Sequence, residues 1–284
     1  MEFRYALSSE VYKLPIEETV RRAARAGYDG IEIAPFTVAD SVDEVPPPRR
    51  EEIARIARGE GIEIVGLHWL LVSPKGLHLT TPDGGVRRRT VAYLEKLVRF
   101  AADLGAKVLV FGSPKQRSIA EGDDRIEATC RAVDALRAVA EACAERGVLF
   151  LLEPLAPAET NFVNTVEEAL EIIRLVGHPS LGYHLDVKAM ASMPGGIIGT
   201  IREYGGGAGH FHANEPGGLA PGMGSVDFRP ILDALAESGY RGWISVEPFS
   251  YEPDPDVVAR TALATLRAAA GWRGARAAEG GSST

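Results

Sequence analysis

The sequence predicts a single-domain (β/α)8 barrel, and three observations support that prediction. Short apolar, β-branched segments recur eight times along the 284 residues. Segments with a helical pattern separate them, and most strand segments begin just after a glycine that suits the left-handed position past a helix end. Eight such units fit one closed barrel, which takes about 250 residues. We expect the barrel to span residues 1–272 and the tail, residues 273–284, to be disordered.

The eight apolar segments are the predicted strands. In chain order they are residues 3–9, 28–33, 62–69, 106–112, 148–153, 178–186, 208–214 and 240–247. Continuous apolar runs are typical of parallel strands that are covered on both faces. An open doubly wound sheet is the alternative. No G-x-G-x-x-G follows the first run and no Walker pattern occurs, which weakens the nucleotide-binding form of that alternative.

The segments between the strands are predicted helices. Residues 227–239 place four apolar side chains on one helical face, namely Phe228, Ile231, Leu232 and Leu235. Thr165 and Glu168 form a capping-box pattern, which predicts a helix start there. Asp227 is the expected N-cap of the helix that follows it. These signals support an alternation of strands and helices along the chain.

Composition excludes several classes of partner. The formal net charge of −8 argues against nucleic acid as the main partner, because phosphate binding needs a basic face. No uncharged apolar run approaches the ~20 residues of a membrane span, and the N-terminus lacks the pattern of a signal peptide. The two cysteines make neither a disulfide framework nor a zinc motif. We therefore expect a cytoplasmic protein with no membrane partner.

Ionisable side chains gather where the predicted strands end. They are Glu32, His68, Glu153, His184, Asp186, His210, His212 and Glu247. Barrel enzymes carry their chemistry at the C-terminal ends of the strands. A carboxylate buried there without a partner costs several kcal/mol, and the carboxylates repel one another unless a cation neutralises them. The sequence therefore predicts a metal site at the mouth of the barrel.

Four of these residues form the predicted ligand set. Glu153, Asp186, His212 and Glu247 offer mostly oxygen atoms, a set that suits Mn2+, Mg2+ or Co2+. His210 and His212 have the same strand parity, so one is expected to bind the metal and the other to support it. In the segment after the fourth run, Lys115 and Arg117 could meet an acidic group, although a solvated charged loop is the favoured interpretation.

Five motifs carry a resemblance to a known family. They are LLEPL with Glu153, HLDVKAM with Asp186, HFHANEPG with His212, PGMGSVDF, and GWISVEPF with Glu247. The steps between the four ligands are 33, 26 and 35 residues. In motif and spacing the chain, over about residues 3–270, resembles the xylose isomerase-like TIM barrels, a superfamily of sugar isomerases and epimerases. The nearest pattern is that of the ketose 3-epimerases of the tagatose and psicose type.

The resemblance implies roles for individual residues. It assigns the metal to the four ligands, and an acid/base pair to Glu153 and Glu247. The residues expected to contact substrate are Glu32, His68, Trp69, Glu159, His184, Lys188 and Glu215. Two positions depart from the pattern: Ala189 stands where the epimerases carry a histidine, and Gly218 stands where they carry an arginine. These departures leave the substrate open, and Lys188 is a candidate to replace part of the function of those two side chains.

The leading hypothesis is a metal-dependent sugar isomerase or epimerase that uses one divalent ion, Mn2+ first and Mg2+ or Co2+ next. It removes a proton next to a carbonyl through a stabilised enediolate. The runner-up is a lyase that dehydrates a keto-sugar, keto-inositol or dehydroshikimate-like substrate through the same intermediate. Phosphodiester hydrolysis and sugar binding without catalysis are weaker alternatives. Analogy with related barrels also allows a homo-oligomer.

Overall fold

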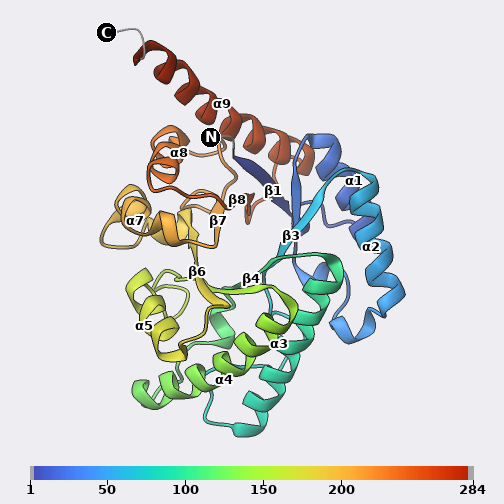
Figure 1. The fold of residues 1–284 in the computed structure, drawn as a ribbon, viewed down its shortest axis with the longest axis vertical. Coiled ribbons are helices and arrows are strands. Elements are labelled where there is room, and N and C mark those ends of the chain that lie inside the picture. The colour runs from blue at the N-terminus through green and yellow to red at the C-terminus, as the bar shows by residue number, and fades with distance from the viewer. Residues whose placement is uncertain (1–2, 281–284) are drawn as a thin grey trace.

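Eight parallel strands close into one barrel in the computed structural model (Figure 1). The structure describes residues 3–280, with side chains up to residue 271. The strands are β1 (Arg4–Ser8), β2 (Gly30–Ile33), β3 (Glu63–Leu67), β4 (Val108–Phe111), β5 (Leu149–Leu152), β6 (Leu181–Asp186), β7 (His210–Ala213) and β8 (Trp243–Val246). Each strand pairs with the next one in the chain, and β8 pairs with β1. The predicted single-domain (β/α)8 TIM barrel is confirmed.

Helices surround the strands as an outer ring (Figure 1). They are α1 (Ile16–Ala26), α2 (Pro47–Gly59), α3 (Gly84–Leu104), α4 (Arg125–Arg146), α5 (Val166–Val176), α6 (Val187–Met190), α7 (Gly196–Tyr204), α8 (Phe228–Glu237) and α9 (Pro255–Gly280). Short 3-10 helices are η1 (Ser9–Val11), η2 (Pro35–Thr37), η3 (Val42–Glu44), η4 (Pro114–Gln116) and η5 (Gly205–Gly207). A disordered tail from residue 273 stays a prediction, because residues 281–284 and the side chains before them lie outside the described residues.

The helix ends follow the signals in the sequence. Thr165 caps α5 by accepting from Glu168 N–H, and Asp227 caps α8 by accepting from Arg229 N–H. Glycines in the left-handed conformation end four helices, and Gly105 after α3 is one example, with φ +85°. After these four helices, the left-handed glycine ends the helix and turns the chain back toward the barrel.

The register of the strands places polar side chains inside the barrel near the C-terminal ends of β6 and β7. His184 pairs with His210, and Asp186 pairs with His212 across β6 and β7. Most of the core is an apolar layer between the strands and the helices. The polar side chains occupy the end of the barrel at which the strands finish, which is where barrel enzymes place their sites.

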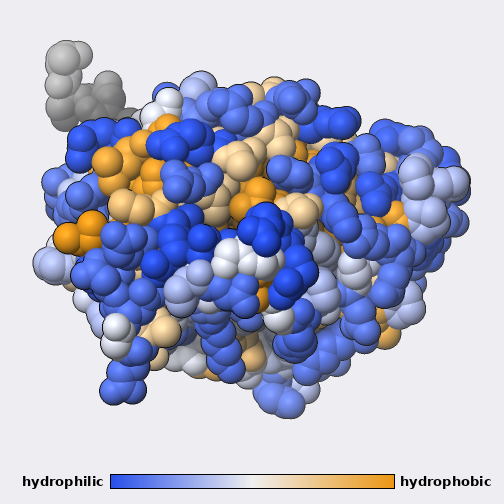
Figure 2. Space-filling view, turned by 90° about the horizontal axis from the view of Figure 1, so that it is seen from below, coloured by the Kyte–Doolittle hydropathy of each residue, from blue (hydrophilic) through white to orange (hydrophobic). Residues whose placement is uncertain are grey.

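One face of the molecule has the mostly hydrophilic surface that is usual for a globular protein (Figure 2). Figure 2 shows a mostly hydrophilic face, on which hydrophobic residues form small separate patches. Cys130 is exposed and Cys143 is buried, and both are free thiols. Within the described residues, no helix combines the length and hydrophobicity needed to span a membrane.

Candidate metal centre

The four predicted ligands stand on four neighbouring strands. Glu153 directly follows β5, Asp186 ends β6, His212 lies in β7, and Glu247 directly follows β8. All four are buried, and His212 is fully inaccessible to solvent. Because the ends of neighbouring parallel strands meet at one rim, residues far apart in the sequence come together here.

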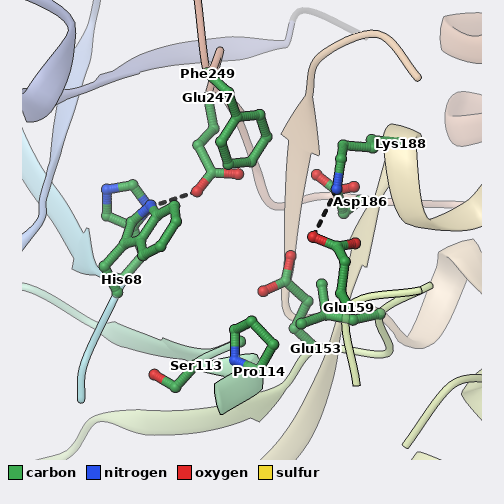
Figure 3. Close-up of a pocket in the computed structure, with 12 residues that line it drawn as sticks. His68, Ser113, Pro114, Glu153, Glu159, Asp186, Lys188, Glu247 and Phe249 are labelled. Carbon is green, nitrogen blue, oxygen red and sulfur yellow. Dashed lines mark hydrogen bonds and ion pairs between the residues drawn. The ribbon is translucent and has the colours of Figure 1, made fainter. Parts of the chain in front are cut away.

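A pocket opens above these residues and encloses ≈ 430 Å³ of space that is partly open to solvent. Its lining includes seven predicted site residues, namely His68, Trp69, Glu153, Glu159, Asp186, Lys188 and Glu247. Figure 3 shows the carboxylates of Glu153 and Glu247 approaching the pocket from opposite sides. A substrate held between them would therefore present one face to each carboxylate.

A carboxylate behind His212 fixes one of its two ring nitrogens. Its Nε2 lies 3.0 Å from Glu32 Oε2, and the same oxygen lies 3.1 Å from His210 Nε2. Its Nδ1 lies 3.1 Å from Glu247 Oε2, outside hydrogen-bond geometry, and has no hydrogen-bond partner among the described residues. A metal-binding histidine normally has one nitrogen fixed by such a carboxylate and the other left for the metal.

The side chains around His212 fit a divalent cation. Glu153, His184, Asp186 and His212 each offer a ligand atom, and these atoms all lie within 4.8 Å of one another. Glu247 belongs to an overlapping group with His212 and His68. The four predicted ligands are therefore brought to one place around His212, with Glu247 turned toward His68. Carboxylate and imidazole donors in this ratio suit Mn2+, Mg2+ or Co2+.

Asp186 is oriented by two hydrogen bonds. Its Oδ1 accepts from the backbone N–H of Ala189 at 2.7 Å, so Asp186 also caps α6. Its Oδ2 accepts from Asn214 Nδ2 at 2.6 Å. The Asn214 Oδ1 in turn accepts from the backbone N–H of Lys188. Asn214, directly after β7, thus bonds both to the end of β6 and to the start of α6.

Glu247 is fixed by His68, which bridges two carboxylates. His68 Nδ1 lies 3.0 Å from Glu247 Oε1, and His68 Nε2 lies 3.1 Å from Glu10 Oε2 (Figure 3 shows the first contact). Burial lowers the pKa of His68, but Glu10 and Glu32 outweigh it and raise that pKa to about 10. Glu10 was missed in the sequence analysis, although it lies in η1, only two residues past the end of β1.

The two carboxylates that face each other have pKa values shifted in opposite directions. Burial and the like charges of Asp186 and Glu247 raise the pKa of Glu153 to about 8. Burial would raise the pKa of Glu247 as well, but His212 and His68 lower it to about 2. Near pH 7 the metal-free site therefore holds one protonated and one ionised carboxyl group, which is the condition for acid and base roles.

Lys188 and Glu159 form an ion pair at the edge of the pocket. Lys188 Nζ lies 2.7 Å from Glu159 Oε1, and it also lies 5.2 Å from the centre of the Phe249 ring. The departures from the epimerase pattern lie close by. At Gly218, φ is +77° and an added Cβ would lie 3.2 Å from Phe249 Cβ, so a larger residue there would displace that ring.

Three residues expected at the substrate lie outside the pocket lining. Glu32 and His184 are buried in the barrel beneath it, and Glu215 accepts from backbone N–H groups of Gly222, Gly224 and Val226. Their direct contact with substrate stays a prediction that this geometry does not favour. Glu32 instead supports His212, and Glu215 supports the loop before α8.

The expected solvated loop after β4 is wrong for Arg117. Its side chain is fully buried and donates to the carbonyl oxygens of Phe111 and Val163. Burial lowers its pKa to about 10 despite Glu153 and Glu159 nearby. Hydrogen bonds to these two carbonyl oxygens stabilise the buried guanidinium. Arg117 is therefore shielded from solvent, and it is not part of the pocket lining.

Comparison with known proteins decides the family. Residues 20–269 match the sequence model described as xylose isomerase-like TIM barrel. The chain belongs to this family. Among its xylose isomerase-like relatives, a probable ketose 3-epimerase from Synechocystis sp. is 29% identical over 237 residues, which are 83% of this chain and 79% of the relative. A putative hydroxypyruvate isomerase from Homo sapiens is 31% identical over 254 residues, 84% of each chain.

A solved structure agrees with this assignment. The structure of an L-ribulose 3-epimerase matches this xylose isomerase-like barrel with a TM-score of 0.83 and 25% sequence identity, over 99% of both chains. The relatives are thus named for epimerisation and isomerisation. The relatives differ in the substrates for which they are named.

Proposed function

We propose that this protein is a divalent-metal-dependent sugar isomerase or epimerase. The observation that carries the proposal is the pair Glu153 and Glu247, which approach one pocket from opposite sides with pKa values shifted in opposite directions. An epimerase of this kind needs a base on one face of the substrate and an acid on the other. The relatives named as epimerases and isomerases support the same reaction class.

Glu247 is the base of this proposal. It is ionised near pH 7, because its pKa is about 2, and can accept the proton of a carbon next to the substrate carbonyl. His68 and His212 stabilise the ionised form and fix the position of the carboxylate. Glu153 approaches from the opposite side of the pocket (Figure 3) and is the acid: once it has taken up a proton there, it returns that proton to the carbon. In the reverse reaction the two residues exchange roles.

The residues that would hold the metal are Glu153, Asp186, His212 and Glu247. A bound divalent cation supplies a positive charge that stabilises the negative oxygens of the enediolate. Mn2+ is our first choice for this oxygen-rich donor set, with Mg2+ and Co2+ next. His212 Nδ1, which lacks a hydrogen-bond partner among the described residues, is the clearest sign of a position for the cation.

The substrate is a small carbohydrate with an α-hydroxy-ketone. We assign its hydroxyl contacts to Glu159 and Lys188, and its apolar C–H faces to Trp69. Lys188 would take over part of the role that the epimerases give to a histidine and an arginine at the positions of Ala189 and Gly218. A partly exposed ammonium in the pocket also suits a carboxylate on the substrate, which is compatible with the hydroxypyruvate isomerase among the relatives.

Deuterium exchange tests the proposal most directly. Mn2+-loaded enzyme is incubated in D2O with D-fructose, D-tagatose and hydroxypyruvate, and the products are followed by NMR and mass spectrometry. We expect deuterium at the carbon next to the carbonyl with the carbon skeleton intact. Glu153→Gln and Glu247→Gln should abolish exchange, whereas Glu141→Gln, at an exposed position on α4, should not. Full turnover in both site variants would refute the acid/base roles.

The same experiment addresses the lyase alternative. Loss of water from the substrate would indicate a dehydratase that uses the same carboxylates. The relatives named for epimerisation and isomerisation give this alternative no support. We therefore keep epimerisation or isomerisation as the proposal.

A further inference from the structure

A second cavity adjoins the metal pocket at the mouth of the barrel. It encloses ≈ 1210 Å³, including space open to solvent, compared with ≈ 430 Å³ for the metal pocket. Its walls come from the loops after β8, β1, β2 and β3, which are neighbours around the closed barrel. The metal ligands come from β5 to β8. The mouth thus has two halves that meet at the loop after β8.

The walls of this second cavity are mainly apolar and aromatic. The side chains that matter are Leu14, Phe36, Trp69, Val72, Phe249 and Tyr251, and we call the space between them the apolar groove. Phe36 and Phe249 are 37% and 42% exposed, so two aromatic rings face solvent in the same hollow. Apolar side chains gathered in a concave surface commonly mark a site for an apolar ligand group.

The apolar groove is continuous with the metal pocket. Trp69 and Phe249 line both spaces, with ring centres 6.0 Å apart in an edge-to-face arrangement. Figure 3 shows the Phe249 ring beside Glu247. Trp69 has φ +53°, a left-handed conformation that is strained for a bulky side chain, and its Nε1 is buried without a hydrogen-bond partner among the described residues. Strain of this kind gathers at ligand sites, because the rest of the fold must hold the residue in place.

We infer that the apolar groove is a substrate subsite for an aromatic or branched-alkyl group attached to the sugar. The inference rests on the proposed function for the sugar part, whose keto group lies in the metal pocket. The attached group packs against Phe36, Trp69 and Phe249, because aromatic rings favour edge-to-face and offset contacts. The polar residues of the same lining are Glu10, Lys13 and Thr37, and Lys13 Nζ lies 4.8 Å from the centre of the Tyr251 ring. A free ketose would leave these rings in water.

Binding of two matched probes tests the subsite. The affinities of Mn2+-loaded protein for methyl and phenyl 3-keto-β-D-glucopyranoside are measured by calorimetry. We expect the phenyl compound to bind about tenfold tighter or more, because its ring is removed from water in the groove. Phe36→Ala should reduce this preference to about threefold or less. Leu175→Ala, a matched exposed apolar position on α5, should keep the full preference.

These measurements distinguish failure of the subsite proposal from failure of the proposed function. Equal affinities in the wild type, or the same preference in Phe36→Ala and Leu175→Ala, would overturn the subsite. Deuterium exchange is measured with the same two compounds and with D-fructose and D-tagatose. A phenyl preference in binding without exchange in any of these sugars would refute the proposed function and leave the subsite standing.

A second copy of this chain is the competing occupant of the apolar groove. Sedimentation of the wild type and Phe36→Ala across concentrations distinguishes it. A sedimentation profile that is the same in both proteins supports the subsite. An oligomer that Phe36→Ala dissociates would show that the groove is a subunit interface and would overturn the inference.

Discussion

Glu32 Oε2 lies 3.0 Å from His212 Nε2, at the bottom of the site and out of reach of the pocket. The carboxylate is fully buried, and the neighbouring imidazoles of His210 and His212 hold its pKa well below the usual range although burial opposes this. It therefore stays ionised and accepts from Nε2–H of His212. Burial would lower the pKa of His212, but Glu32 and Glu247 raise it well above its usual range, so Nδ1 must lose its proton before it can donate an electron pair to a metal on the pocket side.

We predict that Glu32→Gln weakens Mn2+ binding by about 10–100-fold, because loss of a carboxylate behind a metal-binding histidine has that effect. Equilibrium dialysis with metal analysis measures the change. Glu141→Gln, which changes an exposed glutamate in the same way, is the control and should bind Mn2+ like the wild type. Unchanged affinity in Glu32→Gln would show that His212 does not depend on this contact.

Barrel enzymes place their site residues at the C-terminal ends of the strands, and this rule accounts for the site predictions that agree with the structure. Because side chains at the ends of parallel strands share one rim, Glu153, Asp186 and Glu247 could be placed together from their positions alone. The relation of His210 to His212 also followed from strand parity: both contact the same oxygen of Glu32. These predictions need only the barrel geometry, and the structure agrees with them.

The residues that the sequence placed less well depend on contacts between distant loops. Glu10 lies in η1, just past the first apolar run, and its partner His68 is 58 residues away. Arg117 is fully buried because two backbone carbonyls accept its guanidinium, which charge alone does not predict. Glu215 has a carboxylate like those of the ligands, yet it binds three N–H groups of its own loop. Side-chain partners of this kind are specified only by the folded loops.

Metal affinity should fall as the pH falls. In the metal-free site, the pKa of Glu153 is about 8 and that of Asp186 about 6, in both cases because burial and neighbouring carboxylates disfavour the charge. Both residues must lose their protons to bind a cation, so binding releases protons. Between pH 8 and pH 6 we expect the Mn2+ affinity to drop by about tenfold per pH unit for each proton displaced.

Calorimetry in two buffers of different ionisation enthalpy measures those released protons. At pH 7 we expect about two protons per Mn2+, one from Glu153 and one from His212, because Glu32 and Glu247 outweigh burial and raise the pKa of His212 well above its usual range. A dissociation constant that stays the same between pH 6 and pH 8, with no proton release, would show that these carboxyl groups are already ionised or do not bind the metal.

Because Gly112 has no side chain, the carboxylate of Glu153 can occupy the space beside it. A Cβ at this position would lie 2.3 Å from Glu153 Oε2, so the carboxylate must move if the glycine is replaced. We predict that Gly112→Ala lowers kcat/KM by about tenfold to a hundredfold, because a displacement of about 1 Å in a catalytic group has that cost. Gly59→Ala is the control, since a Cβ there meets no atom within 4 Å. Equal kinetics in the two variants would contradict the close approach.

Glu215 should matter for stability more than for chemistry. Its carboxylate accepts three backbone N–H groups from the loop before α8 at 3.0 to 3.2 Å. We predict that Glu215→Ala lowers the free energy of unfolding by about 1–3 kcal/mol, because three part-buried hydrogen bonds lose their charged acceptor. Denaturant titration measures the loss, and Glu237→Ala at the end of α8, away from this loop, should change little. A variant as stable as the wild type would show that water replaces the carboxylate.

The contact between Glu10 and His68 fixes the position of Glu247, the proposed base. Glu10 fixes one nitrogen of His68, and the other nitrogen fixes Glu247 Oε1. We predict that Glu10→Gln lowers kcat by about tenfold or more, because the amide keeps the shape but removes the charge that pairs with His68. Mn2+ affinity should change by less than about threefold, since Glu10 lies outside the group of metal-binding side chains. Steady-state kinetics and metal titration of Glu10→Gln against Glu18→Gln, a change on the surface of α1, separate the two effects. A loss of metal binding equal to the loss of kcat would mean that Glu10 holds the metal site together and does not act on the base.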